Sequence, residues 1–451
     1  MVSKSNINWS SILFTLLLII AISSVIWVLS DIAKIIPNTT THTKEPITTI
    51  KIDSIDDLAN TLGSRFISSN TRQKEKNNTL QAIKNTLQHL QDTNDHQTLQ
   101  DLQNLNLSSA INRLTESAKQ ETKPRDAAKT WVDIGNLQQL QSSQLALYAY
   151  KKASKLDNDN VNAWNRLGHY YRQQKKFTLA ENAYSHVLQS KNLDTQALAH
   201  TNFGLLFQAQ SKLDEAEAAY LKALEINNTQ KNTASLASNS ENLAIIYKQK
   251  DNFEAAEKYY LASLSYYKTL QQKQQIANIQ TSLASLYHQY HKLDSAKQYY
   301  QAALISYLAD ENSKRIANIY SNLGIIEQQQ KQADAAKKLF EQSLEIYRTI
   351  NSKQGIAEQY GHLGILHRSQ KNLSKSESSH LKSLKTYQEL SHPEGISQQQ
   401  TNLGFLYQAW DQTDKACYYW GESKKTLSET NNIRRIQRIE ALINKHCPEN
   451  K

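Results

Sequence analysis

The chain has 451 residues, of which only 11 are Gly and 5 are Pro. Because turns consume Gly and Pro, this scarcity argues against a large β-sandwich, barrel or doubly wound sheet, and favours long helices joined by short polar turns. The 2 Cys residues exclude a disulfide framework and leave at most one disulfide, between Cys417 and Cys447. A net charge of +10 permits an anionic partner, but no basic run exceeds two residues, as on a solvated surface.

The first predicted element is a transmembrane helix at residues 11–29, after a short tail at residues 1–10. Its 19 residues are uncharged and suffice to cross a hydrocarbon core of about 30 Å. The apolar run exceeds that of a signal peptide and no small-residue cleavage site ends it, so we expect an uncleaved single span. Lys residues on its two sides nearly balance, and the short tail favours an orientation with the tail inside. The rest of the chain would then lie on the trans side, which is periplasmic in a bacterium.

Residues 30–79 are expected to form a largely extended linker, because residues 36–50 are rich in Thr and contain two Pro. Residues 80–126 have apolar side chains at helical spacing (Leu80, Ile83, Leu87 and Leu90). They predict a helical capping region formed by a degenerate repeat, or alternatively a short coiled coil. At the other end, residues 432–451 predict a capping helix and a tail, since a stack of repeats must cover its last apolar face.

Between these ends the sequence repeats itself. Small residues stand at positions 204, 244, 284, 324, 364 and 404, in steps of 40. An Ala, an aromatic residue and a second small residue follow all but one of them at fixed spacing, as in Ala336, Phe340 and Ser343. This spacing places them on one face of a helix. Each repeat therefore predicts two antiparallel helices that approach closely at the small residues, with the aromatic filling the gap toward the next pair.

The opening residues of two repeats resemble the tetratricopeptide repeat family. They are Trp131, Ile134 and Gly135, then Trp164, Leu167, Gly168 and Tyr171. The resemblance covers residues 127–431 as eight repeats, and their 40-residue spacing is similar to the longer repeats of kinesin light chains and spindle-orientation adaptors. It implies an all-α fold, a right-handed α-solenoid of antiparallel helix pairs with a concave groove, here preceded by one transmembrane helix.

Three repeats depart from the pattern. Ser376 and His380 replace an Ala and an aromatic residue, which predicts a looser joint near residues 357–390. Gln138 and Glu327 stand where most repeats carry Tyr or Phe.

No catalytic constellation is recognisable. The chain lacks a Gly-rich phosphate loop, a nucleophile elbow and a zinc-protease motif. His288 and His291 share one predicted helix, but two His residues are too few for a metal site. We therefore expect a protein that is not an enzyme, with no cofactor and no metal.

Two positions on the first helix of each repeat are candidates for the groove surface. One carries Arg166 and then mainly Asn, and the other, one turn earlier, carries Asn162, Asn278 and Asn318. In related repeats an Asn here pairs with the backbone of a bound extended peptide, and an amide can both donate and accept hydrogen bonds. The alternative is that Asn merely tolerates an exposed position. The candidate peptide-binding residues are Asn162, Arg166, Asn202, Asn242, Asn278, Asn318, Asn322 and Asn402.

The leading functional prediction is a membrane-anchored scaffold that holds a protein or an extended peptide in its groove, as an adaptor in an envelope-associated assembly. The two candidate groove positions on the first helix of each repeat lack Lys, which argues against a carboxylate clamp made of paired Lys and Asn. A first alternative is a basic scaffold for RNA or another polyanion, which the amide-rich positions disfavour. A second alternative is an accessory subunit of an envelope enzyme or of a secretion complex.

Overall fold

The computed structural model describes residues 54–68, 73–430 and 432–447, and all regular structure within these ranges is helical. The helices are α2 (Ile55–Phe66), α3 (Gln73–Asp92), α4 (His96–Gln103), α5 (Leu107–Gln120), α6 (Pro124–Gln138), α7 (Ser143–Leu156), α8 (Val161–Gln173), α9 (Phe177–Leu188), α10 (Leu193–Ala209), α11 (Leu213–Thr229), α12 (Thr233–Gln249), α13 (Phe253–Thr269), α14 (Lys273–Gln289), α15 (Leu293–Ala309), α16 (Ser313–Gln329), α17 (Ala333–Thr349), α18 (Lys353–Ser369), α19 (Leu373–Glu389), α20 (Pro393–Ala409), α21 (Thr413–Ser428) and α22 (Ile433–His446).

None of these described helices is both long enough and apolar enough to cross a bilayer. The predicted transmembrane helix at residues 11–29, its tail at residues 1–10 and the Thr-rich segment at residues 36–50 lie outside the described residues.

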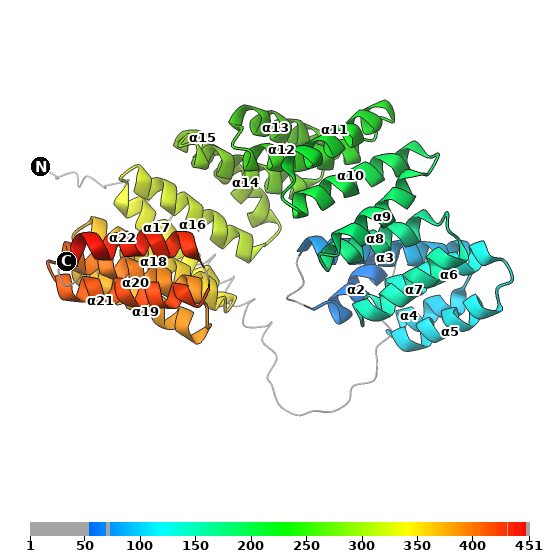
Figure 1. Ribbon diagram of the computed structural model, residues 1–451, viewed down its shortest axis with the longest axis horizontal. Helices are drawn as coiled ribbons and strands as arrows, with labels where there is room; N and C mark the ends of the chain where they lie inside the picture. Colours follow the sequence, from blue (N-terminus) through cyan, green and yellow to red (C-terminus); the bar gives the residue numbers. More distant parts are fainter. Residues whose placement is uncertain (1–53, 69–72, 431, 448–451) are drawn as a thin grey trace, which may run out of the picture.

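The helices α6 to α21 pack as successive antiparallel pairs, α6 with α7, α8 with α9, and so on to α20 with α21. Figure 1 shows these pairs following one another along a curved path, from α6 on one side, over α12, to α21 on the other. The fold is therefore the all-α solenoid that the repeats predict.

The period of 40 residues comes from the regular length of the helices. Each helix from α10 to α20 has 17 residues, and successive helices begin at residues 193, 213, 233 and so on to 393. Each turn has one residue in the left-handed region, a common way of ending a helix. Glycine usually holds this position, but here the residues are Ser211, Lys231, Asp251, Gln271, His291, Glu311, Lys331, Asn351, Lys371, Ser391 and Asp411.

The small residues and the aromatic residues of the repeat meet inside each helix pair. A Cβ atom at Gly204 would lie 2.5 Å from the ring of Tyr220, and one at Gly404 would lie 2.2 Å from Trp420. Such distances are far below van der Waals contact, so the glycine is what lets the aromatic ring lie flat against the partner helix. The predicted close approach of the two helices at these positions is confirmed. The aromatic ring, however, fills space within its own helix pair and not the gap toward the next pair.

The expected linker at residues 30–79 is wrong in its C-terminal part. Residues 55–66 form α2, and α3 begins at Gln73. Ser54 caps α2 by accepting a hydrogen bond from the backbone N–H of Asp57, and Leu58 and Leu62 are buried in the same core as Leu87 of α3. The apolar spacing of α2 is helical, but the Thr- and Pro-rich segment before it dominated the sequence interpretation. Helices α3, α4 and α5 pack around that shared core one after another, which is not the geometry of a coiled coil.

The looser joint expected near Ser376 and His380 is also wrong. Both side chains are fully buried. The hydroxyl of Ser376 donates to the carbonyl of Gly364 (2.7 Å), and the ring of His380 hydrogen-bonds the side-chain oxygen of Gln399 (Nδ1 to Oε1, 2.9 Å). Polar atoms thus replace the apolar contacts of the other repeats while the packing is kept.

Neighbouring pairs are joined by side chains that lie 30 residues apart. The hydroxyl of Tyr247 donates to Glu217 (2.6 Å), and the same contact joins Tyr287 to Glu257 and Tyr407 to Glu377. Glu327, which departs from the aromatic pattern, forms an ion pair with Lys297 at the same spacing (2.5 Å). Cys417 and Cys447 form a disulfide at this spacing as well. Helix α22 therefore takes the place of the first helix of a further repeat.

Candidate functional site

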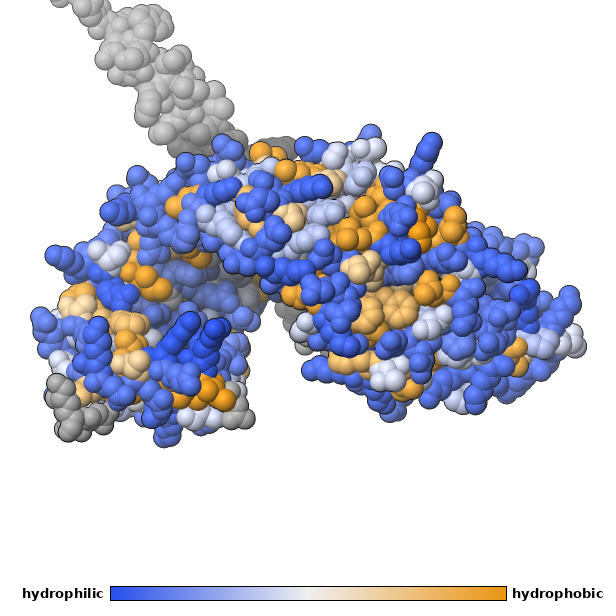
Figure 2. All heavy atoms as spheres, turned by 45° about the horizontal axis from the view of Figure 1, so that its top comes forward, coloured by the Kyte–Doolittle hydropathy of each residue, from blue (hydrophilic) through white to orange (hydrophobic). Residues whose placement is uncertain are grey.

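The inner face of the solenoid is formed by the even-numbered helices from α6 onward. Several side-chain hydrogen bonds join an even-numbered helix to the next even-numbered helix. Such alternate helices approach each other only on the side toward which the stack curves. These hydrogen bonds run from Asn202 of α10 to Asn165 of α8 (2.6 Å), from Thr201 of α10 to Asn239 of α12 (2.9 Å), and from Gln359 of α18 to Ser321 of α16 (3.0 Å). Figure 2 shows the two arms of the molecule separated by an open space, with a mostly hydrophilic surface.

Three of the predicted groove residues have a structural hydrogen bond. The amide of Asn202 is buried and donates to Asn165, as just described. Asn278 accepts from the hydroxyl of Tyr307 (2.9 Å), and Asn318 accepts from the hydroxyl of Tyr347. The contacts of Asn278 and Asn318 each join the end of an odd-numbered helix to the even-numbered helix before it. Asn242 and Asn322 are half-buried on the same face.

Asn162 and Arg166 lie in an open hollow of about 510 Å³ at the N-terminal end of the inner face. Helices α3, α6 and α8 supply most of its lining, and amide side chains predominate. The lining residues are Asn78, Gln81, Asn85, His89, Lys129, Val132, Asp133, Asn136, Asn160, Asn162, Asn165, Arg166, His169 and Leu198.

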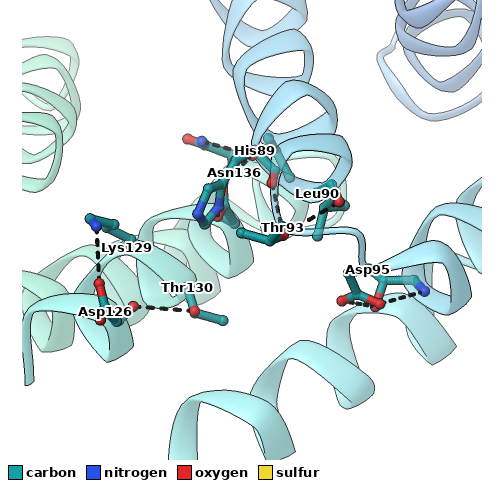
Figure 3. Close-up of polar contacts among 11 residues, drawn as sticks. His89, Leu90, Thr93, Asp95, Asp126, Lys129, Thr130 and Asn136 are labelled. Carbon is teal, nitrogen blue, oxygen red and sulfur yellow. Dashed lines mark hydrogen bonds and ion pairs between the residues drawn. The ribbon is translucent and has the colours of Figure 1, made fainter. Parts of the chain in front are cut away.

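A buried carboxyl group organises the floor of this hollow. Asp133 is 5% exposed; it accepts from the hydroxyl of Thr86 (2.7 Å) and contacts the ring of His89 (Nδ1 to Oδ2, 2.5 Å). Asn136 donates to Thr86 (3.1 Å) and accepts from Tyr150 (3.0 Å). Figure 3 shows His89 of α3 and Asn136 of α6 side by side at this contact. The network fixes the two helices in one relative position, because each buried polar atom needs its partner.

The charges in the hollow favour an anionic group. The hydrogen bond to Asp133 raises the pKa of His89, and burial raises the pKa of Asp133. Lys129 is paired with Asp126 (3.0 Å). In the part of the chain that the structure describes, no carboxylate lies within ion-pair distance of Arg166. The guanidinium can therefore bind an acidic group of a ligand.

The α3 side of this hollow was missed in the sequence. Asn78, Gln81, Asn85 and His89 are spaced at i, i+3, i+7 and i+11, which places them on one helix face. That polar stripe is a usable signal, but Asn78 fell within the expected linker and the other residues within the expected cap.

Asn402 lies in a smaller hollow of about 220 Å³ at the other end of the inner face, between α20, α21 and α22. No group of three or more His, Cys, Asp or Glu side chains is arranged to hold a metal ion in the described ranges.

Family models described as tetratricopeptide repeat match residues 161–192, 194–269 and 315–389. The chain contains tetratricopeptide repeats. A comparison with curated protein sequences found no match.

Among solved structures, the chain is similar to a signal transduction ATPase with numerous domains that has a tetratricopeptide repeat sensor, from Pyrococcus horikoshii. The identity is 16%, the TM-score is 0.56, and the match covers 76% of this chain and 54% of that one. BtubC (BKLC) from P. vanneervenii has 21% identity and a TM-score of 0.41, with 54% of this chain and 94% of that one covered. The quorum sensor NprR from B. thuringiensis has 15% identity and a TM-score of 0.48, with 70% and 97% covered. At 16% identity, the similarity to the signal transduction ATPase shows the fold alone.

Proposed function

We propose that the chain is a scaffold that binds a protein partner through an extended segment lying along the inner face of its repeats. The observation that carries this proposal is the hollow of about 510 Å³ lined by amide side chains from three helices. An amide both donates and accepts, so a row of amides matches the alternating N–H and C=O groups of an extended backbone. Arg166 adds a preference for an acidic group in the bound segment. The chain acts by binding and has no catalytic role of its own.

The scaffold works at a membrane, with residues 11–29 as its single-span anchor and its repeats on the trans side. The length and apolar character of that segment support the anchor. The Cys417–Cys447 disulfide supports the orientation, because disulfides persist in oxidising compartments such as the bacterial periplasm. In that setting the protein is an adaptor in an envelope-associated assembly.

A site-specific photo-crosslinker tests the binding face. The full chain would carry the crosslinker at Asn162, which is exposed and lines the hollow, or at Glu181 of α9, which is exposed and lies outside it. After irradiation of intact cells, mass spectrometry should identify one partner segment joined to position 162 and absent from position 181. Equal adducts at both positions, or none at position 162, would contradict the proposal.

The orientation has its own test. Intact cells would be treated with a membrane-impermeant reductant and then with a membrane-impermeant maleimide. We expect Cys417 or Cys447 to be labelled only after the reductant. Labelling that appears only when the membrane is opened would place the repeats on the inner side.

A further inference from the structure

The outward side of α22, the last of the described helices, carries positive charges only. Arg434, Arg438 and Lys445 are spaced at i, i+4 and i+11, so they lie on one face of the helix, and all three are exposed. Among the residues that the structure describes, no carboxylate lies within ion-pair distance of any of the three. The one acidic residue of α22, Glu440, pairs with Lys424 of α21 (2.9 Å). We call the surface formed by the three cations the basic end face.

Solubility alone does not account for this charge. A stack of repeats needs a terminal helix with a polar outer side, but that side can carry both signs of charge. Helix α2, which Figure 1 shows in the opposite arm of the solenoid from α22, has Asp56, Asp57 and Arg65 exposed, and Asp56 pairs with Lys84 (2.7 Å). The basic end face has no such balance, so its charge is available for an anionic partner.

An aliphatic side chain lies beside the cations. Ile433, the first residue of α22, is 67% exposed, whereas Ile436 and Ile439 of the same helix pack in the core of the last repeat. A helix that combines basic side chains with an exposed aliphatic residue is suited to the head-group region of a bilayer. Single-stranded RNA favours aromatic rings among the cations, and α22 has no Phe, Tyr or Trp. The chemistry of this face therefore favours anionic lipid over nucleic acid.

We propose that the basic end face docks on a membrane surface that contains anionic phospholipids, with its three cations on the lipid phosphates and Ile433 at the boundary with the acyl chains. From Arg434 to Lys445 the helix rises roughly 16 Å, at 1.5 Å per residue. One phosphate cannot bridge this distance, so the partner is a surface with many head groups. The face is separate from the hollow at Arg166, so this inference goes beyond the proposed function and does not depend on it.

Sedimentation with vesicles tests the docking. The full chain, held in nanodiscs of phosphatidylcholine, is mixed with separate vesicles of phosphatidylcholine alone or of equal parts phosphatidylcholine and phosphatidylglycerol. The disc occupies residues 11–29, so sedimentation reports contacts of the rest of the chain; a chain that does not enter the discs is used free. We expect at least ten-fold tighter binding to the mixed vesicles, weakened by added salt. Equal binding to the two kinds of vesicle, or to neither, would overturn the proposal.

Variants locate the contact on α22. A basic residue close to an anionic membrane surface strengthens binding about five-fold, so the triple substitution Arg434→Gln/Arg438→Gln/Lys445→Gln should weaken binding to the mixed vesicles about 100-fold. Its thermal midpoint should not change, because the three side chains have no ion-pair partner among the described residues. Ile433→Gln should weaken binding at least three-fold, because it removes the aliphatic contact. Unchanged affinity in the triple variant would show that the basic end face is not the docking surface.

A matched control removes the same number of charges elsewhere. Lys151→Gln/Lys155→Gln/Lys222→Gln changes three exposed cations on α7 and α11 and should alter vesicle binding less than three-fold. Poly(U) at the same phosphate concentration serves as a competitor, and we expect the chain to stay on the mixed vesicles. Displacement by poly(U) would identify a nucleic-acid surface and contradict the proposal. None of these changes affects a crosslink from Asn162, so this test and that of the proposed function fail separately.

Discussion

The ion pair between Lys297 and Glu327 offers a test of how neighbouring repeats are joined. It stands where the other repeats join a Tyr to a Glu, as in Tyr247 and Glu217. The Glu327 side chain is 9% exposed and the Lys297 side chain is 35% exposed. A hydrogen bond to a charged group contributes about 1.5–3 kcal/mol, and the exposure of Lys297 lowers this value, so we expect Lys297→Met to cost about 2 kcal/mol.

Replacing Lys297 by Glu should cost more, about 3 kcal/mol, because it places two carboxylates against each other in a partly buried site. Adding Glu327→Tyr recreates the Tyr–Glu contact of the other repeats and should recover most of that loss. Urea unfolding followed by circular dichroism at 222 nm would measure these three variants, and the single variant Glu327→Tyr would complete a double-mutant cycle with Lys297→Glu and the double variant. The control is Lys353→Glu, which disrupts an exposed pair with Glu389 and should cost under about 1 kcal/mol. A double variant no more stable than Lys297→Glu alone would refute the reasoning.

Three further predictions concern the C-terminal repeats. Cys447→Ser should destabilise α22 by about 3.6 kcal/mol, the chain-entropy value for a closed loop of 30 residues, and hydrogen exchange in α22 should become faster. Adding Cys417→Ser to this variant should cause no further loss of stability. Gly404→Ala should lower the thermal midpoint, because its Cβ would meet Trp420, whereas Gly421→Ala, with open space around it, should raise the midpoint; equal effects would contradict the packing. Burial lowers the pKa of His380 to about 4 from 6.5 in the unfolded chain. Between these pH values the unfolded state binds more protons than the folded state, so the free energy of unfolding decreases as the pH falls, by about 2 kcal/mol at pH 5. His380→Phe should flatten that part of the curve in unfolding experiments at a series of pH values.

The architecture could be predicted from the sequence because it depends on features that recur. Small residues such as Gly204 and aromatic residues such as Tyr220 mark the contact within each pair, and steric exclusion makes that contact specific. The helix ends are harder to predict. The left-handed turn residue is a Lys at 331 and a Ser at 391, and neither is a residue that usually signals the end of a helix.

The partners of the groove residues could not be predicted, since they come from other helices. Helical spacing places Asn278 and Asn318 on the correct face, but their partners, Tyr307 and Tyr347, lie 29 residues further along the chain, on the second helix of the same pair. Whether the hydroxyl reaches the amide depends on how one helix is rotated against the next. The repeat spacing does predict the disulfide. Cys417 and Cys447 are 30 residues apart, as are Tyr247 and Glu217, so the contact that joins neighbouring repeats brings the two Cys residues together.

These partners change how a ligand can use the inner face. The sequence predicts a row of equivalent amides that grips a strand along its whole length. In the structure, Asn202, Asn278 and Asn318 already hold neighbouring helices together, and a ligand that took their hydrogen bonds would have to displace those contacts. The hollow at the N-terminal end differs, because no carboxylate among the residues that the structure describes lies within ion-pair distance of Arg166. Binding of an acidic group there adds a charged hydrogen bond without breaking an existing ion pair, so the N-terminal end of the solenoid should contribute most of the affinity.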